Sequence, residues 1–361
     1  MTLHFYFARR FLWTFLGLLA VFFLFLGFLD LVEQLRRYDD VGFASVLHLT
    51  FLNIPASLYE MLPLVMILSS IALFLSLARS SELVVARAAG RSGMAALAGP
   101  GLVALFIGLI ALAAVNPIVA GTQTRYFDLR ESFENGGNVV SIGREGLWLR
   151  QGDAEGQTVI RASRASPDAG VLYDVSFLSY DASGPTTRIQ AGEARLGDGA
   201  WQLRDVKIWP LTDVPNPEAQ ARLEETLELP STLTQDDITE RFGRPSSVSI
   251  WNLPGFITGL ESAGFSAQRY IVWMQMELAK PVFLLALMLV GAAFTMRHAR
   301  LGRTGLSVLT AVLLGFGLYY VRNFAQILGE NGQIDPIIAA WIPPVASLTL
   351  AAGVILQRED G

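Results

Sequence analysis

The chain has 361 residues, of which 52% are hydrophobic and 16% are charged. A soluble protein usually carries about 25% charged residues, so this composition indicates a membrane protein. The net charge of −5 lacks the basic excess of a nucleic-acid-binding domain, and the absence of cysteine excludes disulfide bonds and thiolate metal sites.

The first apolar stretch predicts a transmembrane helix. Phe11–Leu29 contains nineteen residues without a charge, which is enough to cross a hydrocarbon core of about 30 Å. A signal peptide is the competing interpretation, because Arg9 and Arg10 precede the stretch. No small-residue cleavage site follows it, so a retained anchor helix is favoured.

Two arginines close the segment after this first span. Arg36 and Arg37 could meet phosphates or carboxylates of an anionic lipid at the membrane surface. The alternative is internal pairing, because Glu33 lies one helical turn before them and Asp39 and Asp40 follow closely. The residues alone leave both interpretations open.

The second and third spans, Phe51–Ala78 and Ala95–Ala120, are joined by a basic loop. In this loop Glu82 falls in the first turn of a predicted short helix, Leu83 contributes to its apolar face, Arg87 adds a basic residue and Gly90 ends it. A short helix between two spans has the shape with which a permease docks an ATPase. An interfacial connector is the equally supported alternative.

The chain then changes character and predicts an all-β domain, either a sandwich or an open jelly-roll-like sheet. Short alternating segments indicate strands, and Gly-Asp-Gly at 197–199 and Ser-Gly-Pro at 183–185 supply turns. The predicted strands are Gly146–Arg150, Thr158–Ala162, Val171–Tyr180, Thr186–Ala191 and Trp201–Trp209.

An amphipathic helix at Pro254–Gln268 is predicted to lead back to the membrane, where three more spans follow. These spans are Tyr270–Met296, Thr304–Val321 and Ile337–Leu356. We therefore expect six transmembrane helices in a three-plus-three arrangement. The expected domains are 1–120 with the first three spans, 121–253 with the sheet, and 254–361 with the amphipathic helix and the last three spans.

Charged residues also occur within the last spans. Glu277 and Lys280 lie three residues apart in the fourth span, where a charge is costly unless it is paired or functional. Their spacing permits a structural pair, and Lys280 is also a candidate lipid contact. Arg322 ends the fifth span and either faces a cavity as a further lipid-binding candidate or extends to the membrane surface.

The basic residues predict the orientation of the spans. Nine lie at the termini and in the loops of one side, whereas Arg36, Arg37 and Arg322 lie on the other. Because basic loops stay in the cytoplasm, both termini are predicted to be cytoplasmic and the β domain to be outside.

Motifs for independent catalysis are missing from the sequence. There is no phosphate-binding G-x-x-x-x-G-K-[ST] loop, and the three histidines lie far apart without ligand spacing. We therefore expect no cofactor, no metal and no catalytic residue, but a transport or assembly component that takes its energy from another subunit.

Taken together, these segments resemble the YjgP/YjgQ permease family, which comprises the lipopolysaccharide-export permeases LptF and LptG. The resemblance extends over essentially the whole chain, and the LptG branch fits better than LptF. It rests on the order and spacing of several pieces, which are Val32-Glu-Gln-Leu-Arg-Arg37, Ser81-Glu-Leu-Val-Val85, Ala89-Gly90, Gly146-Leu-Trp148, Leu260-Glu-Ser-Ala-Gly264, Tyr270, Pro281, Pro336-Ile-Ile and Pro343-Pro-Val-Ala-Ser347.

The resemblance implies a permease subunit in the inner membrane of a Gram-negative bacterium, with the β domain in the periplasm. Its implied partners are an LptB-like ATPase dimer, an LptF-like second permease, a single-span LptC-like protein, lipopolysaccharide and membrane lipid. It also implies that the Glu82 helix is the coupling helix and that Arg36 and Arg37 contact lipid.

Three positions depart from the family pattern. Asp30 replaces a basic residue expected in an LptG, Glu277 stands where lysine is common, and Arg322 stands where an acidic residue occurs. These departures indicate that charge pairs have been exchanged between helices, which affects individual lipid contacts more than the expected function.

Two functions of other classes remain alternatives. A membrane-anchored envelope scaffold or assembly factor would use the β domain to bind partners, but the charged positions inside the spans disfavour it. An ion-coupled secondary transporter would use Glu277 and Lys280, but the chain has no evident inverted repeat.

Overall fold

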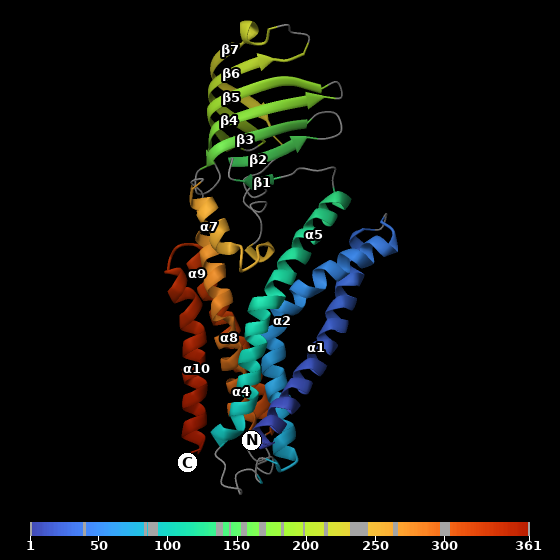
Figure 1. Ribbon diagram of the computed structural model, residues 1–361, viewed down its shortest axis with the longest axis vertical. Coiled ribbons are helices and arrows are strands. Elements are labelled where there is room, and N and C mark those ends of the chain that lie inside the picture. The colour runs from blue at the N-terminus through green and yellow to red at the C-terminus, as the bar shows by residue number, and fades with distance from the viewer. Residues whose placement is uncertain are drawn as a thin grey trace. The chain divides into compact units, whose positions relative to one another are not determined.

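The computed structural model describes most of the chain (Figure 1). The described residues are 2–38, 41–82, 85, 93–134, 140–143, 146–152, 157–165, 171–181, 184–197, 199–212, 216–231, 245–262, 266–296 and 304–359.

Six helical segments in the described part of the chain are long and apolar enough to cross a membrane, which confirms the prediction. They are α1 (Thr2–Arg37), α2 (Phe43–Arg79), α4 (Gly93–Ile110) with its continuation, α8 (Gln268–Thr295), α9 (Thr304–Glu330) and α10 (Pro336–Glu359). The third segment continues from α4 through a π-helical turn, η1 (Ala111–Val115), into α5 (Asn116–Glu134).

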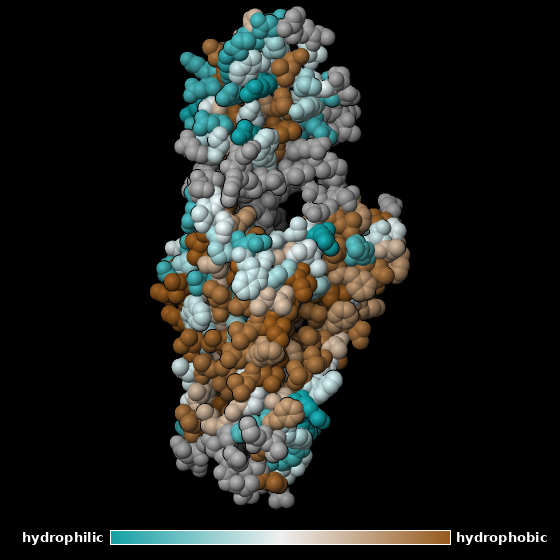
Figure 2. Space-filling view, in the orientation of Figure 1, coloured by the Kyte–Doolittle hydropathy of each residue, from teal (hydrophilic) through white to brown (hydrophobic). Residues whose placement is uncertain are grey.

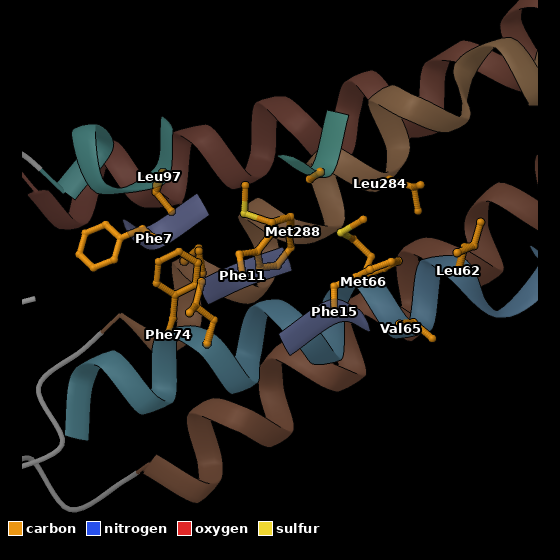
Figure 3. Packing of buried hydrophobic residues seen from close by; sticks show 14 of the residues in the cluster. Phe7, Phe11, Phe15, Leu62, Val65, Met66, Phe74, Leu97, Leu284 and Met288 are labelled. Atoms are coloured by element: carbon orange, nitrogen blue, oxygen red, sulfur yellow. The ribbon is translucent and has the colours of Figure 1, made fainter. Parts of the chain in front are cut away.

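Helix α8 lies at the centre of the membrane-spanning unit, and α1 at its periphery. The apolar window of α8 is 72% buried within the chain, whereas that of α1 is only 6% buried. Aromatic side chains nevertheless anchor one end of α1, because Phe7, Phe11 and Phe15 are buried at successive i,i+4 positions. Figure 3 shows these rings beside residues of α2 and α8, including Phe74 and Met288.

Small residues let the helices approach closely. A Cβ at Gly108 of α4 would lie 2.5 Å from Cα of Pro281 in α8, and one at Gly291 would lie 2.8 Å from Cβ of Ser70 in α2. Ser70 also donates a hydrogen bond to the carbonyl oxygen of Met288 at 2.6 Å. This is the packing expected in lipid, where helices associate through close contact and hydrogen bonds.

The remaining surface of these helices is apolar. Figure 2 shows hydrophobic side chains over the spans, whereas hydrophilic side chains are frequent on the sheet. Exposed Phe25, Leu102 and Leu313 lie on three different spans. In a soluble protein such a surface would be costly, so lipid or another membrane protein is its natural neighbour.

The inserted part is all-β, as predicted. Its described strands form one antiparallel sheet in which each strand pairs with its neighbour in sequence, so this open sheet is a meander. The strands are β1 (Val140–Gly143), β2 (Gly146–Gly152), β3 (Gln157–Ala165), β4 (Val171–Asp181), β5 (Gly184–Gly197), β6 (Ala200–Pro210) and β7 (Arg222–Pro230). All five predicted strands are confirmed, and β1 and β7 are additional.

One face of the sheet is buried. Phe177 and Trp201 are fully buried, with their ring centroids 6.0 Å apart. Along β5 the alternation of Ile189, Ala191 and exposed neighbours follows the two-residue period of a strand. Asp174 in β4 and Asp205 in β6 adopt positive φ, and the regular pairing of these two strands with β5 is interrupted at both residues. Irregularities of this kind bend a sheet.

The predicted amphipathic helix before the fourth span is also present as α7 (Leu253–Ser262). Leu253, Ile257 and Leu260 are buried at helical spacing, and the helix ends earlier than the predicted Gln268.

The chain divides into two compact units. One comprises Met1–Gln123, Ser249–Trp251 and Gln268–Gly361, and the other comprises Thr124–Val248 and Asn252–Ala267. The functional division at 1–120, 121–253 and 254–361 stays a prediction.

Candidate functional site

A cluster of buried polar side chains surrounds Glu277 of α8. Lys280 Nζ donates a hydrogen bond to Glu277 Oε1 at 2.6 Å. The hydroxyl of Tyr59 in α2 donates to Glu277 Oε2, and Asn116 Nδ2 of α5 donates to the same oxygen at 3.3 Å. Glu277 is 0% exposed and Lys280 is 5% exposed. The carboxylate therefore joins three spans in a buried region, where charge-assisted hydrogen bonds are strong.

Aromatic rings lie beside both Lys280 and Arg322. Lys280 Nζ lies 3.4 Å from the centroid of the Tyr59 ring, within the range of a cation–π interaction. Arg322 of α9 is 8% exposed, and its Cζ lies 5.4 Å from the centroid of the Phe283 ring. We refer to Tyr59, Asn116, Glu277, Lys280 and Arg322 as the Glu277 cluster.

The Glu277 cluster contains one acidic and two basic side chains, and an acidic residue beside it offsets the excess positive charge. Glu277 interacts electrostatically with both Lys280 and Arg322, and Glu60 provides a second negative charge near Lys280. Of the two interpretations left open by the sequence, this geometry favours pairing of Glu277 with Lys280. The burial of Arg322 disfavours its extension to the membrane surface.

Asn116 links this cluster to the segment that returns from the sheet. Its Oδ1 accepts a hydrogen bond from the backbone N–H of Ile250 at 2.8 Å. Nearby, Trp251 Nε1 donates to the carbonyl oxygen of Ala113 at 3.1 Å, and Ala113 lies in the π-helical turn η1. Because π-helical turns are frequent at functional sites, this junction belongs to the candidate site.

The lipid-binding candidates Arg36 and Arg37 lie in the last turn of α1, and both are exposed. Arg36 forms no ion pair with Glu33 in the part of the chain that the structure describes. Neither arginine belongs to the Glu277 cluster. The structure therefore separates the four predicted lipid contacts into a buried pair, Lys280 and Arg322, and an exposed pair.

A chain of amide hydrogen bonds connects the same end of α1 to two other spans. Asn53 Nδ2 of α2 donates to Asp30 Oδ1 at 2.8 Å, and Gln123 Nε2 of α5 donates to Asn53 Oδ1 at 3.2 Å. Asp30, where the family resemblance led us to expect a basic residue, thus accepts a hydrogen bond within the spans.

At the other end of α1, Arg10 contacts Glu82 at the start of the loop between the second and third spans. Arg10 Nη1 lies 2.7 Å from Glu82 Oε1 and 2.9 Å from Glu82 Oε2. Arg10 Nη2 donates to Ser76 Oγ in the last turn of α2 at 2.9 Å, and Ser80 Oγ donates to Glu82 Oε1 at 2.8 Å. The guanidinium therefore fastens α1 to the end of α2 and to the beginning of the loop.

The electrostatics of Glu82 agree with this contact. Partial burial opposes its ionisation, but hydrogen bonds from Arg10 and Ser80 outweigh burial and hold the pKa of Glu82 below its ordinary value. The other predicted coupling residues, Leu83, Arg87 and Gly90, lie outside the described residues.

Comparison with known proteins decides the family. The model of the family "Lipopolysaccharide export system permease LptF/LptG" matches residues 5–358. The chain belongs to the LptF/LptG family. It is 26% identical to the lipopolysaccharide export system permease protein LptG of Haemophilus influenzae, over 97% of this chain and 94% of that protein. It is 24% identical to LptG of Escherichia coli, over 92% of each chain.

Membership in the LptF/LptG family makes the chain a multi-pass transport subunit and agrees with the observed arrangement of spans and inserted sheet. Three side chains of these contacts were not predicted from the sequence: Tyr59 and Asn116 of the Glu277 cluster, and Arg10, the partner of Glu82. Arg10 was considered only as a basic residue that flanks the first span and that helps to orient it in the membrane. Asn116 was the signal that could have been noticed, because an amide inside an uncharged span requires a partner.

Proposed function

We propose that this chain is the LptG-type permease of an ATP-driven exporter. It extracts lipopolysaccharide from the outer leaflet of the inner membrane and passes it to a periplasmic bridge toward the outer membrane. An LptB-like ATPase dimer hydrolyses ATP, an LptF-like chain forms the second permease half, and a single-span LptC-like protein joins them. The observation that carries this proposal is the family match over residues 5–358, which includes both sets of spans and the inserted sheet.

The proposed orientation has both termini in the cytoplasm and the sheet in the periplasm. It is supported by the nine basic residues on one side of the membrane against three on the other. In this orientation Arg10 and Glu82 lie at the cytoplasmic surface, and Arg36 and Arg37 lie at the periplasmic surface.

We assign ATPase coupling to the loop that contains Glu82, Leu83, Arg87 and Gly90. Support comes from its position between two spans and from the contact of Glu82 with α1. A loop fastened to a transmembrane helix can transmit a displacement that a loosely attached loop would absorb.

Lipid contact is assigned first to Arg36 and Arg37, because both are exposed at the end of a span and can pair with phosphates. Lys280 and Arg322 are buried, so their contact with lipid would require the Glu277 cluster to open. Exchange of both exposed arginines for glutamate should therefore weaken lipopolysaccharide photocrosslinking to α1 more than exchange of Lys280 for methionine.

The proposal is tested by purifying the tagged chain from its native membrane in a gentle detergent and identifying the copurifying proteins and lipid by mass spectrometry. We expect a P-loop ATPase, a second six-span permease and lipopolysaccharide. Depletion of the chain should also reduce lipopolysaccharide at the cell surface. Recovery of unrelated envelope proteins, together with normal surface lipopolysaccharide, would instead support a scaffold.

A further inference from the structure

Arg10 and Glu82 are 72 positions apart in sequence, yet they form the most extensively hydrogen-bonded ion pair at this end of the described spans. The guanidinium contacts three side chains, Tyr6 of α1, Ser76 of α2 and Glu82 of the loop, because Nη1 also donates to the Tyr6 hydroxyl at 2.9 Å. An arginine needed only for membrane orientation would not require this arrangement, since the positive-inside rule depends on charge alone.

Helix α1 connects this contact to the lipid-binding candidates. It is a single helix from Thr2 to Arg37, and no proline interrupts it. At a rise of about 1.5 Å per residue, Arg10 and Arg36 are separated by about 39 Å along the helix axis. A helix of this kind moves as a rod, so a tilt imposed at one end displaces the other.

The packing of α1 favours such a movement. Phe7 and Phe11 are buried near Arg10, whereas Leu24, Phe25 and Phe28 in the following turns are exposed. The helix is therefore held at the Arg10 end, little covered along its middle, and joined again to α2 by the hydrogen bond from Asn53 to Asp30. A displacement at the Arg10 end is thus carried to the contacts beside Arg36 and Arg37.

We propose that Arg10 is a positioning residue that fastens the coupling loop to α1, so that displacement of the loop by the ATPase is passed along α1 to Arg36 and Arg37. This inference rests on the proposed function. It adds a route by which ATP-driven movement on one side of the membrane reaches the lipid-binding end on the other.

The test measures lipopolysaccharide released per ATP hydrolysed by the purified complex in proteoliposomes. Arg10→Ala should retain the partner proteins and ATP hydrolysis, but reduce lipopolysaccharide released per ATP by about tenfold, within the usual range of coupling between sites. Arg9→Ala is the matched control, because Arg9 is adjacent and exposed, and should keep the ratio of the unaltered protein.

A crosslink that replaces the Arg10–Glu82 contact tests whether Arg10 acts by fastening the loop to α1. Tyr6 accepts a hydrogen bond from Arg10 and Ser80 donates one to Glu82, so both residues lie at the ion pair, and the chain has no cysteine of its own. Tyr6→Cys with Ser80→Cys can therefore be joined by a short thiol crosslinker while Glu82 is kept. In the Arg10→Ala background, crosslinking should restore the release ratio to within about twofold of that of the double-cysteine protein that retains Arg10.

Three results would overturn the inference. They are an unchanged ratio in Arg10→Ala, a parallel loss of complex assembly and ATP hydrolysis in that variant, and failure of the crosslink to restore release. Failure of the unaltered complex to release lipopolysaccharide with ATP would contradict the proposed function itself, so the two failures are distinguishable.

Discussion

Two glutamates in the described part of the membrane-spanning unit pair with basic side chains, but in different surroundings. Glu277 and Lys280 lie within the spans, with side-chain exposures of 1% and 6%, whereas Arg10 and Glu82 are each 31% exposed. A buried pair resists separation because each charge would be left without water, while an exposed pair can exchange its partner for water at little cost. The Glu277 cluster is therefore suited to holding spans together, whereas the Arg10–Glu82 contact adds little stability and is suited to positioning the loop against α1.

The largest expected effect comes from breaking the buried pair. Glu277→Gln leaves the Lys280 charge without its anionic partner and should destabilise the protein by about 3–5 kcal/mol. The measurement is thermal unfolding of the purified complex in detergent. Glu261→Gln, at an exposed position of α7, is the control and should be close to neutral. Combining Glu277→Gln with Lys280→Met should recover most of the loss, and a loss as large as in the single variant would contradict the pairing.

Asn116→Ala should have the next largest effect, about 2–4 kcal/mol, because it removes a hydrogen bond to a charged group and leaves the N–H of Ile250 unsatisfied. Hydrogen exchange should show faster exchange of the Ile250 amide. Asn252→Ala changes a nearby exposed residue and should leave that amide protected. Unchanged exchange at Ile250 in Asn116→Ala would show that the junction does not depend on this side chain.

A smaller effect is expected where α4 meets α8. Gly108→Ala forces a Cβ to within 2.5 Å of Pro281 Cα and should cost about 1–3 kcal/mol through overpacking. Gly121→Ala in α5 is the matched control, because no heavy atom lies within 4 Å of its added Cβ. Equal unfolding temperatures for the two variants would mean that the helices separate easily at Gly108.

The Arg10–Glu82 pair should contribute least to stability, less than about 1 kcal/mol at neutral pH, because it is partly exposed. The depressed pKa of Glu82 means that this contribution is fully present above the unfolded pKa, near the ordinary value of 4.5, and is lost as the pH falls through the folded pKa. A double-mutant cycle of Arg10→Ala and Glu82→Ala checks this sign by unfolding at about pH 7 and about pH 4. Coupling that grew on acidification would contradict it.

Much of the fold could be predicted from the sequence because its signals are local. Stretches without charged residues predicted the spans, and alternation of apolar and polar residues predicted the strands with a buried face. Strand β7 was missed because its residues Arg222–Pro230 carry several glutamates and no buried side chain. The full length of α1 was underestimated, since the helix continues at both ends beyond the apolar stretch Phe11–Leu29.

The site was less predictable because its contacts join distant parts of the chain. The i,i+3 spacing of Glu277 and Lys280 indicated a pair, and the pair is present. Tyr59 and Asn116 reach Glu277 across 218 and 161 positions, so no local pattern could link them. The contact between Arg10 and Glu82 depends likewise on how α1 packs against α2.

The central claim, that this chain is the permease half of an ATP-driven lipopolysaccharide exporter, is tested most directly by reconstitution. The complex purified through this chain is placed in proteoliposomes loaded with lipopolysaccharide, and transfer to an added soluble acceptor is measured with and without ATP. We expect transfer that requires ATP and continues when an imposed proton gradient is collapsed. Two results would contradict an ATP-driven exporter. They are transfer that does not require ATP but stops when the gradient is collapsed, and the absence of transfer by the complete complex.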